Sequence, residues 1–249
     1  MGQGLAERLI RKGIMSRAAL FVAGLTMLIG SDPSVAQGQA PGLLDLRIVT
    51  VKPNRIDEWV ELQHEMNAAR EEAGMSAREF WLVEIGDLDT FHIFTPIIRV
   101  GEEELPWVSD EAAQWTARVN DTLVSRRNMV LRIHPASIPR VEGKQYDFAV
   151  VRTRVAHRNH FTDLFNWYGE KWYPFQREAG SEAMLLTQIV YAGNARTMYS
   201  VDLYEDLDEL NAPPSLPPAE TRELLAEGTP YVELASQILL RRHHDLSSR

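Results

Sequence analysis

NHFTDLFNWYGEKWYPFQREAG, residues 159–180, is the stretch that decides the fold. Its large apolar residues recur at steps of three and four, which places them on one face of a helix. This stripe comprises Phe161, Leu164, Phe165, Tyr168, Trp172, Phe175 and Ala179. We expect Asn159 to cap the helix and Gly180 to end it in a left-handed conformation. Pro174 lacks an N–H, so a kink near residues 170–173, or a second short helix starting at Pro174, is predicted.

An earlier stretch, residues 54–74, repeats this pattern. Its stripe comprises Trp59, Leu62, Met66, Ala69 and Ala73. The two helices end alike, with REEAG in the first and QREAG in the second. Each follows a strand-like run and leads into another, so the chain is predicted to contain two copies of one unit. Apolar stripes of this kind are more typical of a helix packed on a core than of a cofactor site.

Length and composition exclude several classes of function. The 249 residues suffice for two small domains or one large one. The formal charge of -9 and the absence of a basic stripe argue against nucleic acid as a partner. Cysteine is absent, which excludes disulfides, thiol nucleophiles and cysteine-ligated metals.

The N-terminus has the pattern of an export signal. Four basic residues open the chain: Arg8, Arg11, Lys12 and Arg17. Residues 18–29 form an apolar run too short to span a bilayer comfortably. Ser34-Val35-Ala36 then fits a small-x-small cleavage site, so residues 1–36 are predicted to be a cleaved signal peptide and the mature protein periplasmic or secreted. An uncleaved anchor and a start at Met15 stay open as alternatives.

The remaining pattern predicts six elements in each of two units, residues 43–138 and 145–244. The first unit is expected to contain strands 44–51, 79–85, 90–95 and 129–134 and helices 54–74 and 111–125. The second is expected to contain strands 146–155, 183–191, 197–204 and 237–243 and helical regions 159–180 and 207–225. The order strand, helix, strand, strand, helix, strand is that of a ferredoxin-like unit. The fold class is therefore α+β.

Two such units in tandem resemble the dimeric α/β-barrel superfamily, in particular its NIPSNAP-type and antibiotic-biosynthesis-monooxygenase-type members. The resemblance covers residues 43–244 and implies two sheets packed face to face as a barrel within one chain. Members include cofactor-independent monooxygenases, haem-binding proteins and isomerases, so the resemblance does not select one activity. No catalytic motif of the superfamily is found, and no residue role is carried over.

Candidate site residues follow from the alternation of side chains along the strands. Apolar positions are assigned to the helix-covered faces: Leu46, Ile48, Val83, Ile85, Phe91, Ile93, Leu131 and Ile133. Polar positions alternate with them and are assigned to the face between the sheets: Glu84, His92, Arg132, His134, Arg152, Arg154, Gln188, Asp202, Arg241 and His243. If the sheets face each other, the polar side chains line a shared pocket.

Two interpretations of this polar set stay open. In one, His92 or His134 is a catalytic base, and the acidic group of an apolar or aromatic ligand is bound by the other polar residues. These ligand-binding candidates are Glu84, Arg132, Arg152, Gln188, Asp202 and Arg241. In the other, the charges form structural ion pairs, because buried charges must be paired.

Three functions compete on this basis. The leading hypothesis is an exported protein that binds a small molecule in a pocket between two sheets. The alternatives are a cofactor-independent monooxygenase or isomerase with an inward-facing histidine as base, and a structural or oligomerising protein without a ligand. A homodimer stays open, and no cofactor is predicted. No metal is predicted either, since His157 and His160 lack a third ligand in sequence.

Overall fold

A computed structural model of the protein describes residues 42–75, 78–85, 89–97, 109–212 and 216–247. The predicted signal peptide, residues 1–36, lies outside the described residues. Within them, no helix combines the length and the apolar character needed to cross a bilayer.

The predicted order of elements is confirmed in both halves. The first half contains β1 (Leu43–Val51), the short turn η4 (Pro53–Arg55), α2 (Ile56–Glu72), β2 (Glu79–Ile85), β3 (Thr90–Ile97), α3 (Ser109–Thr122) and β4 (Leu123–Ile133). The second half contains β5 (Phe148–Ala156), α4 (Phe161–Trp167), η5 (Tyr168–Trp172), α5 (Tyr173–Glu178), β6 (Met184–Tyr191), β7 (Thr197–Tyr204), α6 (Leu207–Asn211), α7 (Pro218–Gly228), η6 (Thr229–Tyr231) and β8 (Val232–Arg242). The last strand of each half begins earlier than predicted.

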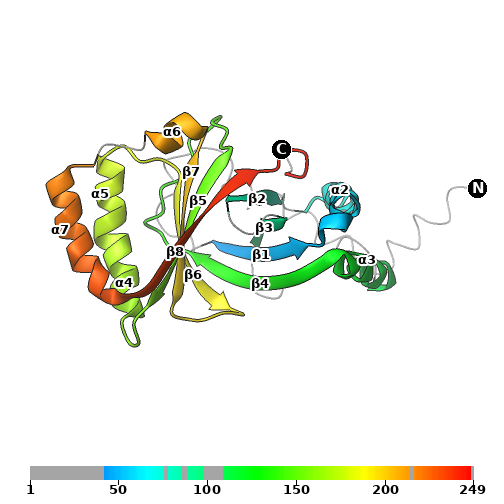
Figure 1. Cartoon of the computed structure of the whole chain (residues 1–249), viewed down its shortest axis with the longest axis horizontal. Helices are drawn as coiled ribbons and strands as arrows, with labels where there is room; N and C mark the ends of the chain where they lie inside the picture. Colours follow the sequence, from blue (N-terminus) through cyan, green and yellow to red (C-terminus); the bar gives the residue numbers. More distant parts are fainter. Residues whose placement is uncertain (1–41, 76–77, 86–88, 98–108, 213–215, 248–249) are drawn as a thin grey trace, which may run out of the picture. The chain divides into compact units, whose positions relative to one another are not determined.

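The eight strands form one closed barrel in the order β1-β3-β2-β8-β5-β7-β6-β4. Two antiparallel pairings join the halves: β2 with β8, and β4 with β6. Figure 1 shows the long strands β4 and β8 running across the junction between the halves. The predicted fold, two ferredoxin-like units combined as a dimeric α/β barrel within one chain, is therefore confirmed.

The interior of the barrel is an apolar core to which all eight strands contribute. Its buried members include Leu44, Leu46, Trp81, Val83, Phe94, Met129, Leu131, Ala149, Val151, Ile189, Tyr199, Val201, Leu203 and Leu240. The prediction of a polar pocket between the sheets is wrong, because these side chains fill that space. Of the positions assigned to the helix-covered faces, Phe91 and Ile93 are confirmed. Leu46, Ile48, Val83, Leu131 and Ile133 point into the barrel instead, and Ile85 is exposed.

Helices cover the outer face of the sheet in each half. In the first half, Trp59, Leu62 and Met66 of α2 pack with Phe80 and Phe91. In the second half, α4, η5, α5 and α7 form the cover (Figure 1).

The long helical segment of the second half, residues 161–178, has the predicted irregularity. It takes the form of a π-helical turn, η5, directly before the segment with Pro174. Gly180 has the predicted left-handed conformation, with φ of 84°. The prediction that Asn159 caps the helix is wrong, because Asn159 itself has φ of 70° and the capping position falls on His160.

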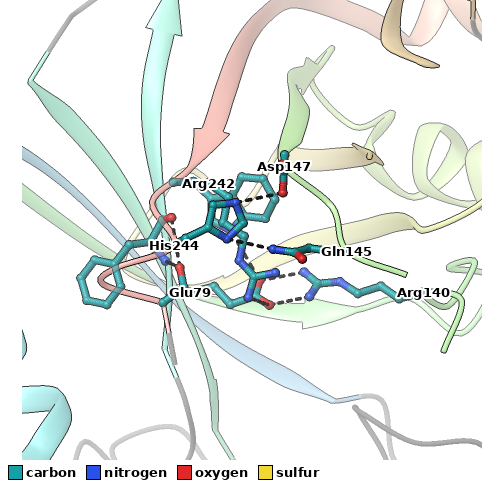
Figure 2. Close-up of polar contacts among 9 residues, drawn as sticks. Glu79, Arg140, Gln145, Asp147, Arg242 and His244 are labelled. Atoms are coloured by element: carbon teal, nitrogen blue, oxygen red, sulfur yellow. Dashed lines mark hydrogen bonds and ion pairs between the residues drawn. The ribbon is translucent and has the colours of Figure 1, made fainter. Parts of the chain in front are cut away.

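Polar contacts also join the halves outside the barrel, where the C-terminal segment crosses to the first half. His243 N donates to Phe80 O at 2.8 Å, and Ser247 Oγ accepts from Phe80 N at 3.0 Å. Figure 2 shows Glu79 between Arg140 and Arg242, with Arg140 Nη2 donating to Glu79 Oε2 at 2.7 Å. Residues from both halves therefore meet along this junction.

Candidate functional site

The eight candidate residues from the sequence lie in three separate places. His92 faces the barrel interior, opposite Ile48 and Trp81 on the neighbouring strands. Glu84 and Arg241 form an ion pair on the outside of the barrel. The other five share the outer face of the sheet in the second half, on or beside its strands: Arg132, His134, Arg152, Gln188 and Asp202.

His92 is a core histidine. Its side chain is 5% exposed, and Nδ1 is buried without a hydrogen-bond partner. Burial lowers the pKa of His92 to about 4, because desolvation disfavours the charged ring. The predicted inward orientation is therefore confirmed, and the His92 side chain is enclosed by the apolar core.

The predicted orientation of Glu84 and Arg241 is wrong. Arg241 lies opposite Leu82, whose side chain belongs to the helix-covered face, and Leu240 beside it points into the barrel. A register shift between Val83 and Ile85 accompanies this local change. Arg241 Nε lies 3.0 Å from Glu84 Oε2 in a largely exposed pair.

Strand register brings the other five candidates together. One row across the sheet runs from Arg152 on β5 through Ser200 on β7 to Leu186 on β6. His134 lies beside this row, because its backbone N–H donates to the Leu186 carbonyl at 2.8 Å. The next row runs through Arg154, Met198, Gln188 and Arg132. These positions point outward, toward the helices, because Val151 and Tyr199 point inward. The prediction that this set faces the other sheet is therefore wrong, although the set itself is brought together.

The centre of this face is a cluster that we call the arginine layer: Arg152, Arg154, Ser200, Asp202, Tyr168 and Tyr173. Arg152 Nη1 contacts Asp202 Oδ2 in an ion pair. Arg154 Nη1 donates to Ser200 Oγ at 2.9 Å, and its guanidinium lies 4.9 Å from the centre of the Tyr168 ring. Two polar atoms of the layer are buried without a well-formed hydrogen bond: Asp202 Oδ1, and Tyr173 Oη beside Ser200.

The arginine layer carries two guanidinium groups and one carboxylate. Within the described part of the chain, no carboxylate lies at ion-pair distance from Arg154. Burial lowers the pKa of Arg154, and the neighbouring charge of Arg152 acts in the same direction. A charge that is partly removed from water without a charged partner is less stable than a paired one, so this arrangement is compatible with an added anion. The Arg152 side chain is 30% exposed, so the layer meets solvent at this arginine, whereas Tyr168, Tyr173 and Ser200 are buried.

His134 reaches this face from the end of the first half. Its ring lies against the π-helical turn, where a Cβ on Gly169 would come within 2.3 Å of His134 Cε1. The Ala136 N–H donates to His134 Nδ1 at 3.0 Å, so the neutral ring carries its proton on Nε2. Burial lowers the pKa of His134, while Glu170 partly opposes this shift. At neutral pH, His134 therefore presents a hydrogen-bond donor.

Sequence alternation had singled out Arg154 but not its partners Ser200, Tyr168 and Tyr173. Tyr168 was assigned to an apolar helix stripe, and Ser200 lies in a strand with no local signal. Only the cross-strand register, which pairs Arg152 with Ser200, places them together.

The fold is similar to that of solved proteins with which the chain shares little sequence. Neither a protein-family model nor a protein of curated function matches the sequence. A proposed monooxygenase from Fusobacterium nucleatum matches with a TM-score of 0.61 at 11% identity, over 82% of this chain and 94% of that chain. A proposed monooxygenase from Lactobacillus acidophilus gives a TM-score of 0.60 at 14% identity, over 81% and 94%.

A mutant chlorite dismutase from Candidatus Nitrospira defluvii matches with a TM-score of 0.51 at 11% identity, over 87% of this chain and 98% of that chain. The protein has the dimeric α/β-barrel fold. In this dimeric α/β barrel, both ferredoxin-like halves belong to one chain. At such identities the similarity establishes the fold alone, so the function must be argued from the site.

Proposed function

We propose that the protein binds a small aromatic acid at the arginine layer, between the sheet and the helices of its second half. The observation that supports this proposal is the partly buried guanidinium of Arg154, which among the described residues has a hydroxyl and a ring face as neighbours but no carboxylate at ion-pair distance. An anionic ligand would supply the missing charge and form a charge-assisted hydrogen bond with the guanidinium.

The neighbouring groups define the rest of the ligand. Asp202 Oδ1 is a buried acceptor without a hydrogen-bond partner in the described part of the chain, so a ligand hydroxyl next to the acidic group could donate to it. The aromatic side chains of the covering helix, including Tyr168 and Phe165, favour a flat apolar body. The ligand class is therefore an aromatic carboxylate with an adjacent hydroxyl.

Binding agrees better with the geometry than catalysis by the predicted histidines. A cofactor-independent monooxygenase or isomerase needs a base within reach of its substrate. His92 is enclosed by the barrel core, and His134 presents an N–H because its Nδ1 already accepts a hydrogen bond. Export is part of the proposal on the strength of the N-terminal sequence pattern alone.

The test is a fluorescence titration with 3-hydroxy-2-naphthoate. The wild type is expected to bind this anion, and Arg154→Met to bind it at least about tenfold more weakly, because the charge-assisted bond is lost. The neutral amide of the same probe is expected to bind more weakly than the acid. The affinity for 2-naphthoate, which lacks the hydroxyl, is expected to lie between these two. Arg118→Met, which removes an exposed arginine paired with Glu65 on the first half, is the matched control and should leave affinity unchanged. Equal affinity of Arg154→Met and wild type for the acid would refute the proposal.

A further inference from the structure

A pocket lies at the junction of the two halves, away from the arginine layer. It has a volume of about 490 Å³ and is lined by Leu82, Asp147, Phe148, Arg241, Arg242, His243, His244 and Asp245. We call it the junction pocket. Leu82, Arg241 and Phe148 lie in one row across β2, β8 and β5, so this row forms a partly apolar wall. The volume lies within the usual range for small-molecule sites.

The polar groups of the junction pocket are unevenly satisfied. Figure 2 shows the His244 ring held between Gln145 and Asp147: Nδ1 lies 3.1 Å from Gln145 Nε2, and Nε2 lies 2.9 Å from Asp147 Oδ1. Both ring nitrogens therefore lie close to a polar neighbour, although the contact with Asp147 Oδ1 is not a well-formed hydrogen bond. What His244 offers to the pocket is the face of its ring.

The basic groups, by contrast, keep free donors. Arg241 reaches Glu84 through Nε, and in the described part of the chain its two Nη atoms make no hydrogen bond. Arg242 Nη2 lies 3.7 Å from Glu79 Oε1, and the buried Arg242 Nε has no hydrogen-bond partner among the described residues. The planar guanidinium of Arg241 matches a carboxylate with two parallel hydrogen bonds.

We propose that the junction pocket is a second binding site, which takes a flat aromatic monocarboxylate. The ring lies over Leu82 and Phe148, and the carboxylate meets the Nη atoms of Arg241. Glu84 competes with this carboxylate for the same guanidinium. The site shares no residue with the arginine layer and is independent of the function proposed there.

The test follows the backbone amides in 1H–15N spectra during a titration with 2-naphthoate. The titration uses Arg154→Met, so that binding at the arginine layer does not contribute. The amides of residues 147–148 and 241–245 are expected to shift. Adding Arg241→Gln should weaken the affinity at least about tenfold, and Arg241→Lys should weaken it less, because it keeps the charge but loses the fork.

Glu84→Gln is the sharper variant. It removes the competing carboxylate, so the affinity for 2-naphthoate should rise, whereas a purely structural ion pair gives no such gain. Arg118→Gln, in an exposed pair with Glu65, is the control and should have no effect. The proposal is overturned if the amides around the pocket do not shift, if Arg241→Gln binds as tightly as its parent, or if 2-naphthamide binds as well as the acid.

Discussion

The helix-covered faces of the two halves are built at equivalent positions but filled differently. Val49 and Arg154 each lie two residues before the end of the first strand of their half, Val51 and Ala156. Ile93 and Ser200 are likewise equivalent, since they lie opposite Arg47 and Arg152. The first half therefore has aliphatic side chains where the second has a guanidinium and a hydroxyl.

An arginine on each face can be compared: Arg78 in the first half is buried, and Arg154 in the second half is partly buried. Arg78 is 4% exposed, and its guanidinium donates to Asn67 Oδ1 at 2.6 Å, to Gln63 Oε1 at 3.2 Å and to Gln63 O at 3.4 Å. It also lies over the Phe80 ring, at 4.8 Å. Among the described residues, the Arg154 side chain contacts the Ser200 hydroxyl and the Tyr168 side chain. Helix α2 of the first half therefore supplies acceptors from two residues to Arg78, whereas Ser200 on β7 gives Arg154 one hydroxyl acceptor.

The helices differ in the same sense. α2 is a regular helix of 17 residues, whereas its counterpart in the second half is interrupted by the π-helical turn η5. Such turns are frequent at functional sites. The difference between the halves teaches that two copies of one fold need not be covered alike, and it agrees with the binding site proposed for the second half.

The largest change in stability is expected when an arginine is placed in the first half at the position equivalent to Arg154. Val49→Arg places a guanidinium in an aliphatic layer, and we expect the free energy of unfolding to fall by about 3 to 5 kcal/mol. Urea denaturation measures this. Val49→Met, which adds volume without charge, is the control and should cost less than about 1.5 kcal/mol. A loss for Val49→Arg no larger than this would show that the first half tolerates the charge.

The second-largest effect is a pH dependence of stability that comes from His92 in the barrel interior. His92 has a folded pKa of about 4, below the unfolded value of about 6.5, so the unfolded state takes up a proton first as pH falls. Its contribution is present above pH 6.5 and is lost as the pH falls toward 4. We expect wild type to lose about 3 kcal/mol more stability over that window than His92→Leu does. Urea denaturation across this pH range checks it, and parallel curves for the two proteins would contradict it.

A smaller effect is expected at the contact between His134 and the π-helical turn. Gly169→Ala places a methyl group against the His134 ring, and we expect a loss of about 1 to 3 kcal/mol in unfolding free energy. Combining it with His134→Ala should recover most of that loss, because the ring that collides is gone. A double-mutant cycle measures the recovery. Additive losses would show that the two residues do not meet.

The fold was predictable because its signal is repeated. Helix stripes, helix ends and strand order occur twice, and each copy supports the interpretation of the other. The direction of the strand faces was not predictable. Runs such as FWLV in β2 and FHIF in β3 are apolar on both faces, so periodicity gives no choice between interior and helix side.

Only the charged residues of the candidate site could be predicted from the sequence. Arg152 and Asp202 stand out as charged residues within strands, and the pairing of β5 with β7 brings them close together. Ser200 and Tyr173 carry no such signal, since a serine in a strand and a tyrosine in a helix are ordinary in sequence. Their role comes from packing between distant segments, which a single sequence does not display.

The most direct test compares Arg78→Met with Arg154→Met by urea denaturation without ligand. Arg78→Met leaves the buried acceptors of Asn67 and Gln63 unpaired, so it should lower the free energy of unfolding by about 2 to 3 kcal/mol. Arg154→Met removes an uncompensated cation and should leave stability unchanged or raise it. Equal losses in the two variants would contradict the account, because Arg154 would then hold the fold together rather than await an anion.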